Sequence, residues 1–234
     1  MKARIRFPWY LTWGLMLVAA LGVGLVTRLS YADVSAHPEE LYGMTYQVAP
    51  FSTEEFNRYA EGVGDPGTKR ALMDAEAVVR VRRKGLPVYR YKAFTTNVHI
   101  DEVLRGDEAL AGTSINVYEP VSMNKRGSEK VLTAADAYQF GSVPMRDDDE
   151  YILFLNSAPK NRVVGDAWTL AVSPFSKLVV NGSPRCVVHS GLDGGLRRAD
   201  LLDADMVAES REDRDAYLRE CADVVRGLGM NDEN

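Results

Sequence analysis

One uncharged segment near the N-terminus constrains how the whole chain can fold. Residues 9–27, WYLTWGLMLVAALGVGLVT, contain nineteen residues without a charge. As a helix that rises about 1.5 Å per residue, they span roughly 28 Å, which is close to the hydrocarbon thickness of a bilayer. The segment is therefore predicted to cross a membrane rather than to lie buried in a globular core.

The flanking residues predict the orientation of this segment. Lys2, Arg4 and Arg6 precede it, and basic residues stay on the cytoplasmic side of a membrane. The alternative is a secreted protein that has lost a signal peptide after Ala32, since Ser30 and Ala32 are small residues at suitable positions. The length of the apolar run favours a retained anchor, and both interpretations place residues 33–234 outside the cytoplasmic membrane.

Composition predicts one globular domain after this segment, and its charge argues against one class of partner. Of the 234 residues, 46% are hydrophobic, which is ordinary for a folded domain. Residues 29–234 carry 24 basic and 33 acidic residues. Because a nucleic-acid-binding surface needs clustered positive charge, no nucleic acid partner is expected. The densest basic group is predicted to be a solvated strand face: Arg80, Arg82, Arg83 and Lys84.

Residue periodicity predicts a mainly β domain between two helices. Phe94, Thr96, Val98 and Ile100 alternate with polar residues, as in a half-buried strand. The run Tyr151–Leu155 is apolar throughout and predicts a strand buried on both faces. Several such segments, separated by turn residues, favour a small antiparallel β-barrel or sandwich, in a mainly β (α+β) chain with flanking helices. A hairpin turn is expected at residues 181–184.

The two helices have their own sequence patterns. Phe51 and Phe56 can form a hydrophobic staple at the start of the first helix. In the second helix, Ser210 and Asp213 resemble a capping box, and an apolar stripe follows that would pack on the barrel. The expected organisation is a cytoplasmic N-terminus at 1–8, a transmembrane signal anchor at 9–27, a stem at 28–50, a helix at 51–64, the barrel domain at 70–200 and a C-terminal helix at 205–229.

An ordered set of segments resembles a known group of domains. These segments are DAEAVVRVRRKG at 74–85, VHIDEVLRGD at 98–107, SINVYEP at 114–120 and DDEYILFLNS at 148–157. Together they resemble the OB-fold-like barrel of small exported bacterial proteins of unknown function, which is distantly similar to the netrin and tissue-inhibitor-of-metalloproteinase module. The resemblance covers about residues 74–173 and implies a barrel fold. The inhibitors in that group bind a protease zinc through an N-terminal cysteine, and this chain has no cysteine before Cys186, so no functional residue transfers.

The residues needed for metal, cofactor or catalytic chemistry do not form local motifs. The three histidines, His37, His99 and His189, include no pair four residues apart, and no metal site or cofactor is expected. The acidic run at 147–150 lacks the alternate spacing of a calcium loop, so a solvated loop is favoured over a weak calcium site. An enzyme would require Asp101, Glu102 or Asp166 to converge with His99 or His189 in one cleft, and no catalytic residue is assigned.

The two cysteines, Cys186 and Cys221, leave two interpretations open. An exported domain can join them in a disulfide, which would stabilise the fold by roughly 3–4 kcal/mol. Cys221 also falls on the apolar stripe of the C-terminal helix, where a buried free thiol is common.

The tripeptide Arg105-Gly106-Asp107 matches an integrin-binding motif by its letters. Two adjacent apolar residues, Val103 and Leu104, interrupt the alternation before it, which predicts a β-bulge and then a turn. Gly106 supplies the permissive backbone and Asp107 can bond to its own backbone, so a structural turn is favoured over adhesion.

These observations favour a membrane-anchored extracytoplasmic binding module of the cell envelope, whose partner would be an envelope protein or a glycan. Tyr89, Tyr91 and Tyr118 are candidates for an aromatic binding face on the strands, although packing in the core or at the rim is commoner for tyrosines at strand ends. The alternatives are an exported hydrolase that acts on envelope material, or a protease-inhibitor-like module.

Overall fold

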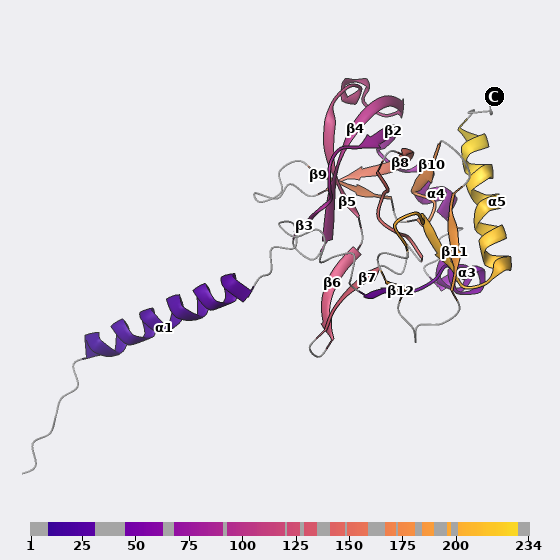
Figure 1. Cartoon of the computed structure of the whole chain (residues 1–234). Helices are drawn as coiled ribbons and strands as arrows, with labels where there is room; N and C mark the ends of the chain where they lie inside the picture. The colour runs from indigo at the N-terminus through magenta and orange to yellow at the C-terminus, as the bar shows by residue number, and fades with distance from the viewer. Residues whose placement is uncertain are drawn as a thin grey trace, which may run out of the picture.

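The β-domain of this chain is built on a closed five-stranded barrel. The computed structural model describes residues 9–30, 45–62, 68–90, 93–119, 121–126, 129–134, 141–147, 149–158, 167–171, 173–180, 184–189, 196–197 and 201–228. Around the barrel the strands follow the order β8, β2, β4, β5, β9, and β9 pairs with β8 to close the ring (Figure 1). Their bounds are β2 (Ala77–Arg83), β4 (Ala93–Arg105), β5 (Ser114–Glu119), β8 (Glu150–Ser157) and β9 (Ala167–Leu170).

The expectation of a wholly antiparallel barrel is wrong at one pair. Strands β5 and β9 run parallel, whereas the other four pairs of the ring are antiparallel. A closed ring with an odd number of strands cannot alternate in direction all the way round, so at least one neighbouring pair must be parallel. A closed barrel of five strands therefore requires a parallel pair, which here is β5 with β9.

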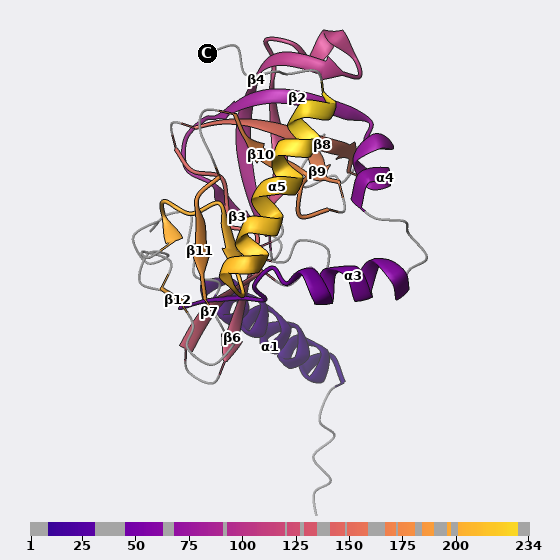
Figure 2. The same cartoon turned by 90° about the vertical axis from the view of Figure 1, so that its right-hand side faces the viewer.

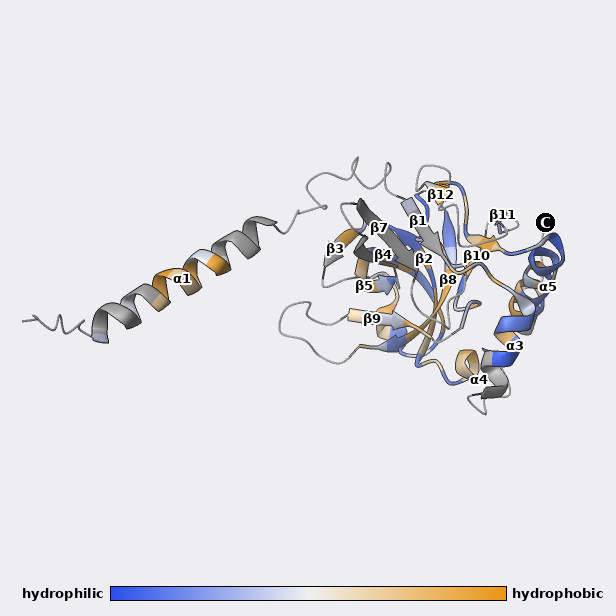
Figure 3. Ribbon diagram, turned by 90° about the horizontal axis from the view of Figure 1, so that it is seen from below, coloured by the Kyte–Doolittle hydropathy of each residue, from blue (hydrophilic) through white to orange (hydrophobic). Residues whose placement is uncertain are grey.

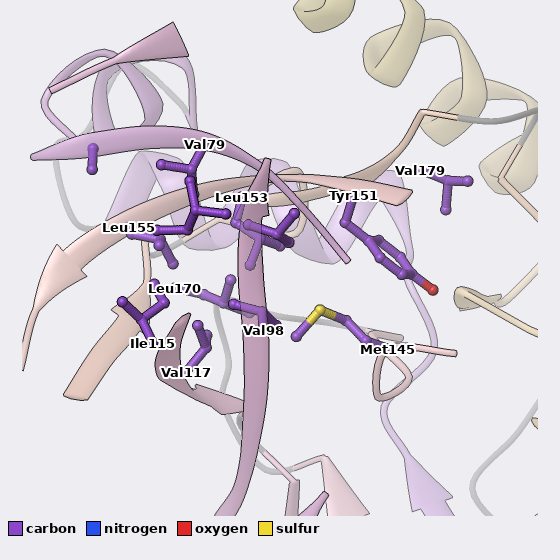
Figure 4. Close-up of a cluster of buried hydrophobic side chains, with 13 residues drawn as sticks. Val79, Val98, Ile115, Val117, Met145, Tyr151, Leu153, Leu155, Leu170 and Val179 are labelled. Carbon is purple, nitrogen blue, oxygen red and sulfur yellow. The ribbon is translucent and has the colours of Figure 1, made fainter. Parts of the chain in front are cut away.

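The barrel interior is filled by alternate residues of its strands, as the sequence predicted. Val98 and Ile100 of β4 are fully buried, and so are Tyr151, Leu153 and Leu155 of β8. We call this cluster the inner core, and Figure 4 shows its side chains converging from all sides of the barrel. Its members are Ala77, Val79, Val81, Val98, Ile100, Ile115, Val117, Met145, Tyr151, Leu153, Leu155, Leu170 and Val179.

A second cluster, the outer core, lies on the other side of β2 and β8. It includes Val78, Ile152 and Phe154, which point away from the barrel interior. Strand β8 is thus buried on both faces, as its continuous apolar sequence predicted, and Figure 3 colours it as hydrophobic. The members of the outer core are Phe51, Leu72, Ala75, Val78, Ile152, Phe154, Ala171, Phe175, Leu178, Met206, Tyr217 and Cys221.

Helices cover the outer core (Figure 2). The predicted apolar stripe of α5 (Arg211–Gly227) packs on it, and Tyr217 stacks on Phe175 with ring centroids 5.3 Å apart. The predicted staple is present at α3 (Thr53–Gly62), where the Phe51 and Phe56 rings are 5.8 Å apart. A short helix, α4 (Thr68–Met73), adds Leu72 to the same cluster.

The start of α5 differs from the sequence prediction. Ser210 caps this helix, because its hydroxyl accepts a hydrogen bond from the Asp213 N–H at 3.0 Å. The expected start at residue 205 is wrong because Met206–Ala208 form strand β13, which is buried and runs parallel to β11 (Cys186–Val188). The carboxylate of Asp213 also accepts the Thr53 N–H at 2.8 Å, so one side chain joins the starts of α3 and α5.

Several strands lie outside the ring. Strand β10 (Lys177–Val179) extends the barrel sheet beside β8, and β3 (Val88–Arg90) pairs with β4. The expected hairpin across 181–184 is wrong, since β10 pairs with β8 whereas β11 pairs with β13. A separate four-stranded sheet has the order β12-β1-β7-β6, with bounds β1 (Thr45–Val48), β6 (Val121–Arg126), β7 (Glu129–Ala134) and β12 (Leu196–Arg197). Part of the expected stem thus contributes a strand to this sheet.

The N-terminal segment forms helix α1 (Trp9–Ser30), which lies apart from the strands in Figure 1. Over the residues that the structure describes, no helix combines the length and the hydropathy that a membrane crossing requires. The expected cytoplasmic residues 1–8, residues 31–44 of the expected stem and the cleavage position after Ala32 lie outside the described residues.

A buried segment without regular structure closes one end of the barrel. Residues 142–146, which we call the plug, have almost no exposed surface, and the Met145 side chain enters the inner core (Figure 4). Buried backbone groups must find hydrogen-bond partners, and a segment outside a sheet ladder must find them elsewhere. The plug finds them mainly in side chains from the barrel.

Charged and polar side chains supply these partners. Glu119 accepts the Met145 N–H at 2.7 Å, and Lys177 donates to the Val143 carbonyl. Arg83 donates to the Met145 carbonyl at 2.7 Å, and the Tyr151 hydroxyl accepts the Arg146 N–H at 2.8 Å. Four strands of the barrel sheet thus hold one irregular segment in place.

The same side chains also satisfy one another. Lys177 Nζ lies 3.6 Å from Glu119 Oε2, and Thr96 donates to the other oxygen of Glu119. The Arg146 side chain makes two 3.1 Å hydrogen bonds to Asp205, which also accepts the Tyr151 hydroxyl at 3.3 Å. Burial, and then the charge of Asp205, raise the pKa of Tyr151, so this hydroxyl stays protonated and able to donate. The buried charges of this region are therefore paired.

Gly141, directly before the plug, gives the first prediction. It has φ +74°, and a Cβ there would overlap the Val207 carbonyl oxygen and approach the Phe51 nitrogen to 2.9 Å. Gly141→Ala should therefore destabilise the fold by about 3 kcal/mol or more, in unfolding by chemical denaturant. Gly85→Ala is the matched control, because Gly85 has φ +70° with open space around its Cβ position, and should cost only about 1 kcal/mol. Equal losses in the two variants would contradict the packing described at the plug.

Candidate functional site

The candidate site is the face of β4 and β5 that points away from the barrel interior. Residues of these strands alternate between the two sides, and Val98, Ile100, Ile115 and Val117 occupy the inner core. The residues between them must therefore face outward. We call this surface the β4–β5 outer face, and it consists of Asn97, His99, Asp101, Ser114, Asn116 and Tyr118.

Strand register aligns these side chains in pairs across the two strands. Asn97 lies opposite Asn116, and His99 lies opposite Ser114. Asn97 Nδ2 donates to Asn116 Oδ1 at 3.1 Å, whereas Ser114 Oγ and His99 Nδ1 are 3.5 Å apart. Cross-strand neighbours of this kind hold one another in position. The result is a row of amide, hydroxyl and imidazole groups, with no net charge unless His99 is protonated.

An ion pair ends this row on the side of β2. Arg82 makes a two-pronged contact with Asp101, with hydrogen bonds of 2.8 Å and 3.0 Å. This guanidinium holds the pKa of Asp101 below its usual value, because it stabilises the charged carboxylate. His99 Nε2 is 4.0 Å from Asp101 Oδ1, so Asp101 lies between a permanent cation and a histidine.

Acidic side chains neutralise the basic residues that the sequence grouped on β2. Arg80 donates to Glu150 at 2.7 Å and lies 3.8 Å from Glu102. Arg83 is not on a solvated face as expected, because its side chain is mostly buried against the plug and contacts Asp147 at 2.9 Å. The surface around the β4–β5 outer face thus carries paired basic and acidic side chains rather than a positive patch.

The residues proposed for a hydrolase converge only in part. His99 and Asp101 lie together, and Ser114, which was not among the predicted residues, extends them into a line. Both oxygens of Asp101 are already engaged by Arg82. Ser114 lies at the limit of hydrogen-bond distance from His99, which is long for an activated nucleophile. Glu102 faces Arg80, His189 bonds through its backbone to Ala208, and Asp166 lies outside the described residues.

Metal-binding groups do not gather in the part of the chain that the structure describes. Within it, no cluster of three or more His, Cys, Asp or Glu side chains could hold a metal ion. In the acidic run, Asp147 pairs with Arg83, Asp149 with Arg146 and Glu150 with Arg80. His37 and Asp148 lie outside the described residues.

The Arg105-Gly106-Asp107 segment has structural contacts at each residue. The Arg105 guanidinium donates to the carbonyls of Leu72 and Ala75 at the end of α4, at 2.6 Å and 3.1 Å. Gly106 has φ +119°, and Asp107 caps a short 3-10 turn, η1 (Glu108–Leu110), by accepting the Ala109 N–H. Val78 pairs with Arg105 and Val79 pairs with Val103, so Leu104 has no partner in the register of β2. This irregularity lies where the β-bulge was predicted.

The remaining candidates from the sequence are three tyrosines and two cysteines. Of the three tyrosines, Tyr118 is half-buried on the β4–β5 outer face, whereas Tyr91 and the side chain of Tyr89 lie outside what the structure describes. Cys186 and Cys221 are free thiols that both pack in the outer core. The buried charges Glu119 and Lys177 were not foreseen, although Glu119 continues the inward alternation of Ile115 and Val117 and could have been found by it.

Comparisons with known proteins give no further assignment: no protein-family model, no curated protein and no solved structure matches this chain.

The Arg82–Asp101 pair gives a prediction with a defined pH range. Because the folded pKa of Asp101 is lowered, its stabilising effect is present above the unfolded value near 4 and is lost as the pH falls through the folded value. Asp101→Asn should therefore lower the melting temperature at pH 7, and this difference from the native chain should disappear once the pH is below the lowered pKa of the folded state. Arg82→Gln should cause the same loss, and the double variant little more. A difference that persists unchanged at low pH would contradict the assignment.

Proposed function

We propose that this chain is a membrane-attached binding module that works outside the cytoplasmic membrane, and that it binds its partner through the β4–β5 outer face. The uncharged residues 9–27 and the basic residues before them support export and attachment. The acidic balance of the remaining chain supports a partner other than nucleic acid.

The observation that carries the proposal is the position of the polar row on a five-stranded barrel. Barrels of the OB type bind oligonucleotides and oligosaccharides on the outward face of their second and third strands. In the ring described above, the second and third strands along the chain are β4 and β5. The proposed OB-like relationship therefore places the ligand on the surface where Asn97, His99, Ser114 and Asn116 lie.

The chemistry of this surface favours a glycan as the partner. Side-chain amides both donate and accept hydrogen bonds, which matches the hydroxyl groups of sugars. Tyr118 adds an amphipathic ring beside them. The surrounding arginines are occupied by carboxylates, so they offer little to a phosphate or to an acidic polymer. A polar loop of an envelope protein is the competing partner.

An exported hydrolase is the second candidate, and the line of Ser114, His99 and Asp101 is the observation that favours it. The engagement of Asp101 by Arg82 weakens it, since a triad carboxylate must orient the histidine. A protease-inhibitor-like module has only the distant resemblance of the barrel segments in its favour.

Partner binding gives the third prediction. The full chain, solubilised in detergent, should retain purified envelope polysaccharide in a pull-down assay and in titration calorimetry. Asn97→Ala with Asn116→Ala should weaken binding about tenfold, because several hydrogen bonds are removed together. Arg219→Ala, on the exposed side of α5, is the matched control and should bind as the native chain does.

Three results would count against the proposal. Binding that is unchanged in the double variant would exclude the β4–β5 outer face. Retention of an envelope protein but no polysaccharide would replace the glycan with a protein partner. Hydrolysis of the polysaccharide that is abolished by Ser114→Ala would favour the enzyme. The intact mass of the chain isolated from cells distinguishes a retained anchor from cleavage after Ala32.

A further inference from the structure

The two cysteines of the chain lie on elements that pack against each other. Cys186 is the first residue of β11 and is half-buried, and Cys221 is buried on the inward side of α5. Helix α5 packs against both β11 and β13. Both thiols contact the same outer core, although 34 residues separate them in the sequence. The fold thus brings together the two cysteines that the sequence left unassigned.

Burial and nearby side chains determine whether these two thiols are protonated. Burial raises the pKa of Cys186 and that of Cys221 to about 12 each. The proximity of Cys186 also contributes to the raised pKa of Cys221 and to that of Tyr217, which lies one helical turn away. Asp205 and Arg214 act on Cys186 in opposite directions, and Glu220 raises the pKa of Cys221. Both thiols are therefore protonated at neutral pH.

We propose that Cys186 and Cys221 form a redox pair, which closes into a disulfide between β11 and α5 when the chain folds in the presence of a disulfide oxidant. A thiolate is the species that attacks a disulfide, and these thiols are seldom ionised once buried. The bond should therefore form during folding, and should form slowly in the folded protein. In cells the proposal rests on the export proposed above, because an oxidising compartment is needed.

The reaction balances with oxidised glutathione as the oxidant. The Cys186 thiol is the more accessible of the two, and it loses its proton and attacks one sulfur of glutathione disulfide. This step forms a mixed disulfide and releases one glutathione. The Cys221 thiol then loses its proton and attacks Cys186 Sγ, which releases the second glutathione. The protein loses two hydrogen atoms and two electrons, and one glutathione disulfide becomes two glutathione thiols.

The bond would fix the C-terminal helix on the barrel. The loop that it closes contains β12, β13 and the first half of α5. In this region α5 covers the outer core, and one residue, Glu209, separates its capping residue Ser210 from β13. A crosslink from Cys221 to β11 would keep α5 over Phe175 and Ile152 even if the cap opened.

Redox titration tests the pair directly. The full chain is refolded in detergent with glutathione buffers of increasing oxidised fraction, then quenched and alkylated. The oxidised product should lack two hydrogen atoms by intact mass, should give one crosslinked peptide that contains both cysteines, and should melt roughly 6–15 °C above the reduced form. Cys186→Ala and Cys221→Ala should each abolish this difference, and the double variant should melt alike in both buffers.

Two results would overturn the redox pair. The first is that both cysteines stay alkylatable at every glutathione ratio. The second is that oxidation yields only glutathione adducts or crosslinked dimers. A third result separates this proposal from export: the disulfide forms in vitro, but alkylation of living cells finds both thiols free. That result would support the redox pair and would contradict export.

Discussion

The plug at residues 142–146 is the constraint on which the rest of this structure depends. It has no sheet ladder to satisfy its backbone, yet it is buried and Met145 fills the inner core. Leaving a buried backbone group unpaired costs about 1–3 kcal/mol, so each one needs a partner. Strand ends of the barrel and of β10 beside it provide them through Glu119, Lys177 and Arg83.

This requirement explains why an apolar barrel contains buried charges. A buried ion pair adds little net stability, since the loss of hydration offsets the attraction between the charges. Here the pair of Glu119 and Lys177 has a second task, because each member also holds a backbone group of the plug. Buried ionisable groups are often taken as signs of catalysis, but these groups are fully used by the fold. The binding site proposed above therefore lies away from these groups, on the β4–β5 outer face.

Much of the fold could be predicted from local sequence, for a physical reason in each case. Alternation of Phe94, Thr96 and Val98 predicts a half-buried strand, and the unbroken apolar run of β8 predicts burial on both faces. Neither pattern contains information on which strands pair. The parallel contact of β5 and β9, the pairing of β11 with β13 and the sheet that includes β1 were missed for that reason. These contacts join residues far apart in the sequence.

The same limit applies to the candidate site and to Arg105-Gly106-Asp107. Alternation alone predicts that His99 and Asp101 face outward, but only register shows that Ser114 and Asn116 lie opposite them. The turn at Gly106 was predicted from the glycine and the bulge before it. The contact of Arg105 with the end of α4 could not be predicted, because nothing in the sequence indicates that this helix lies beside the turn.

Amide hydrogen exchange in the native protein tests the central claim about the plug most directly. The Met145 and Arg146 amides donate to Glu119 and Tyr151 inside the fold. They should therefore exchange as slowly as amides in the middle of β4 and β8, because all of them become exposed only when the barrel opens. Exchange of these two amides as fast as that of the exposed Leu86, between β2 and β3, would contradict the account.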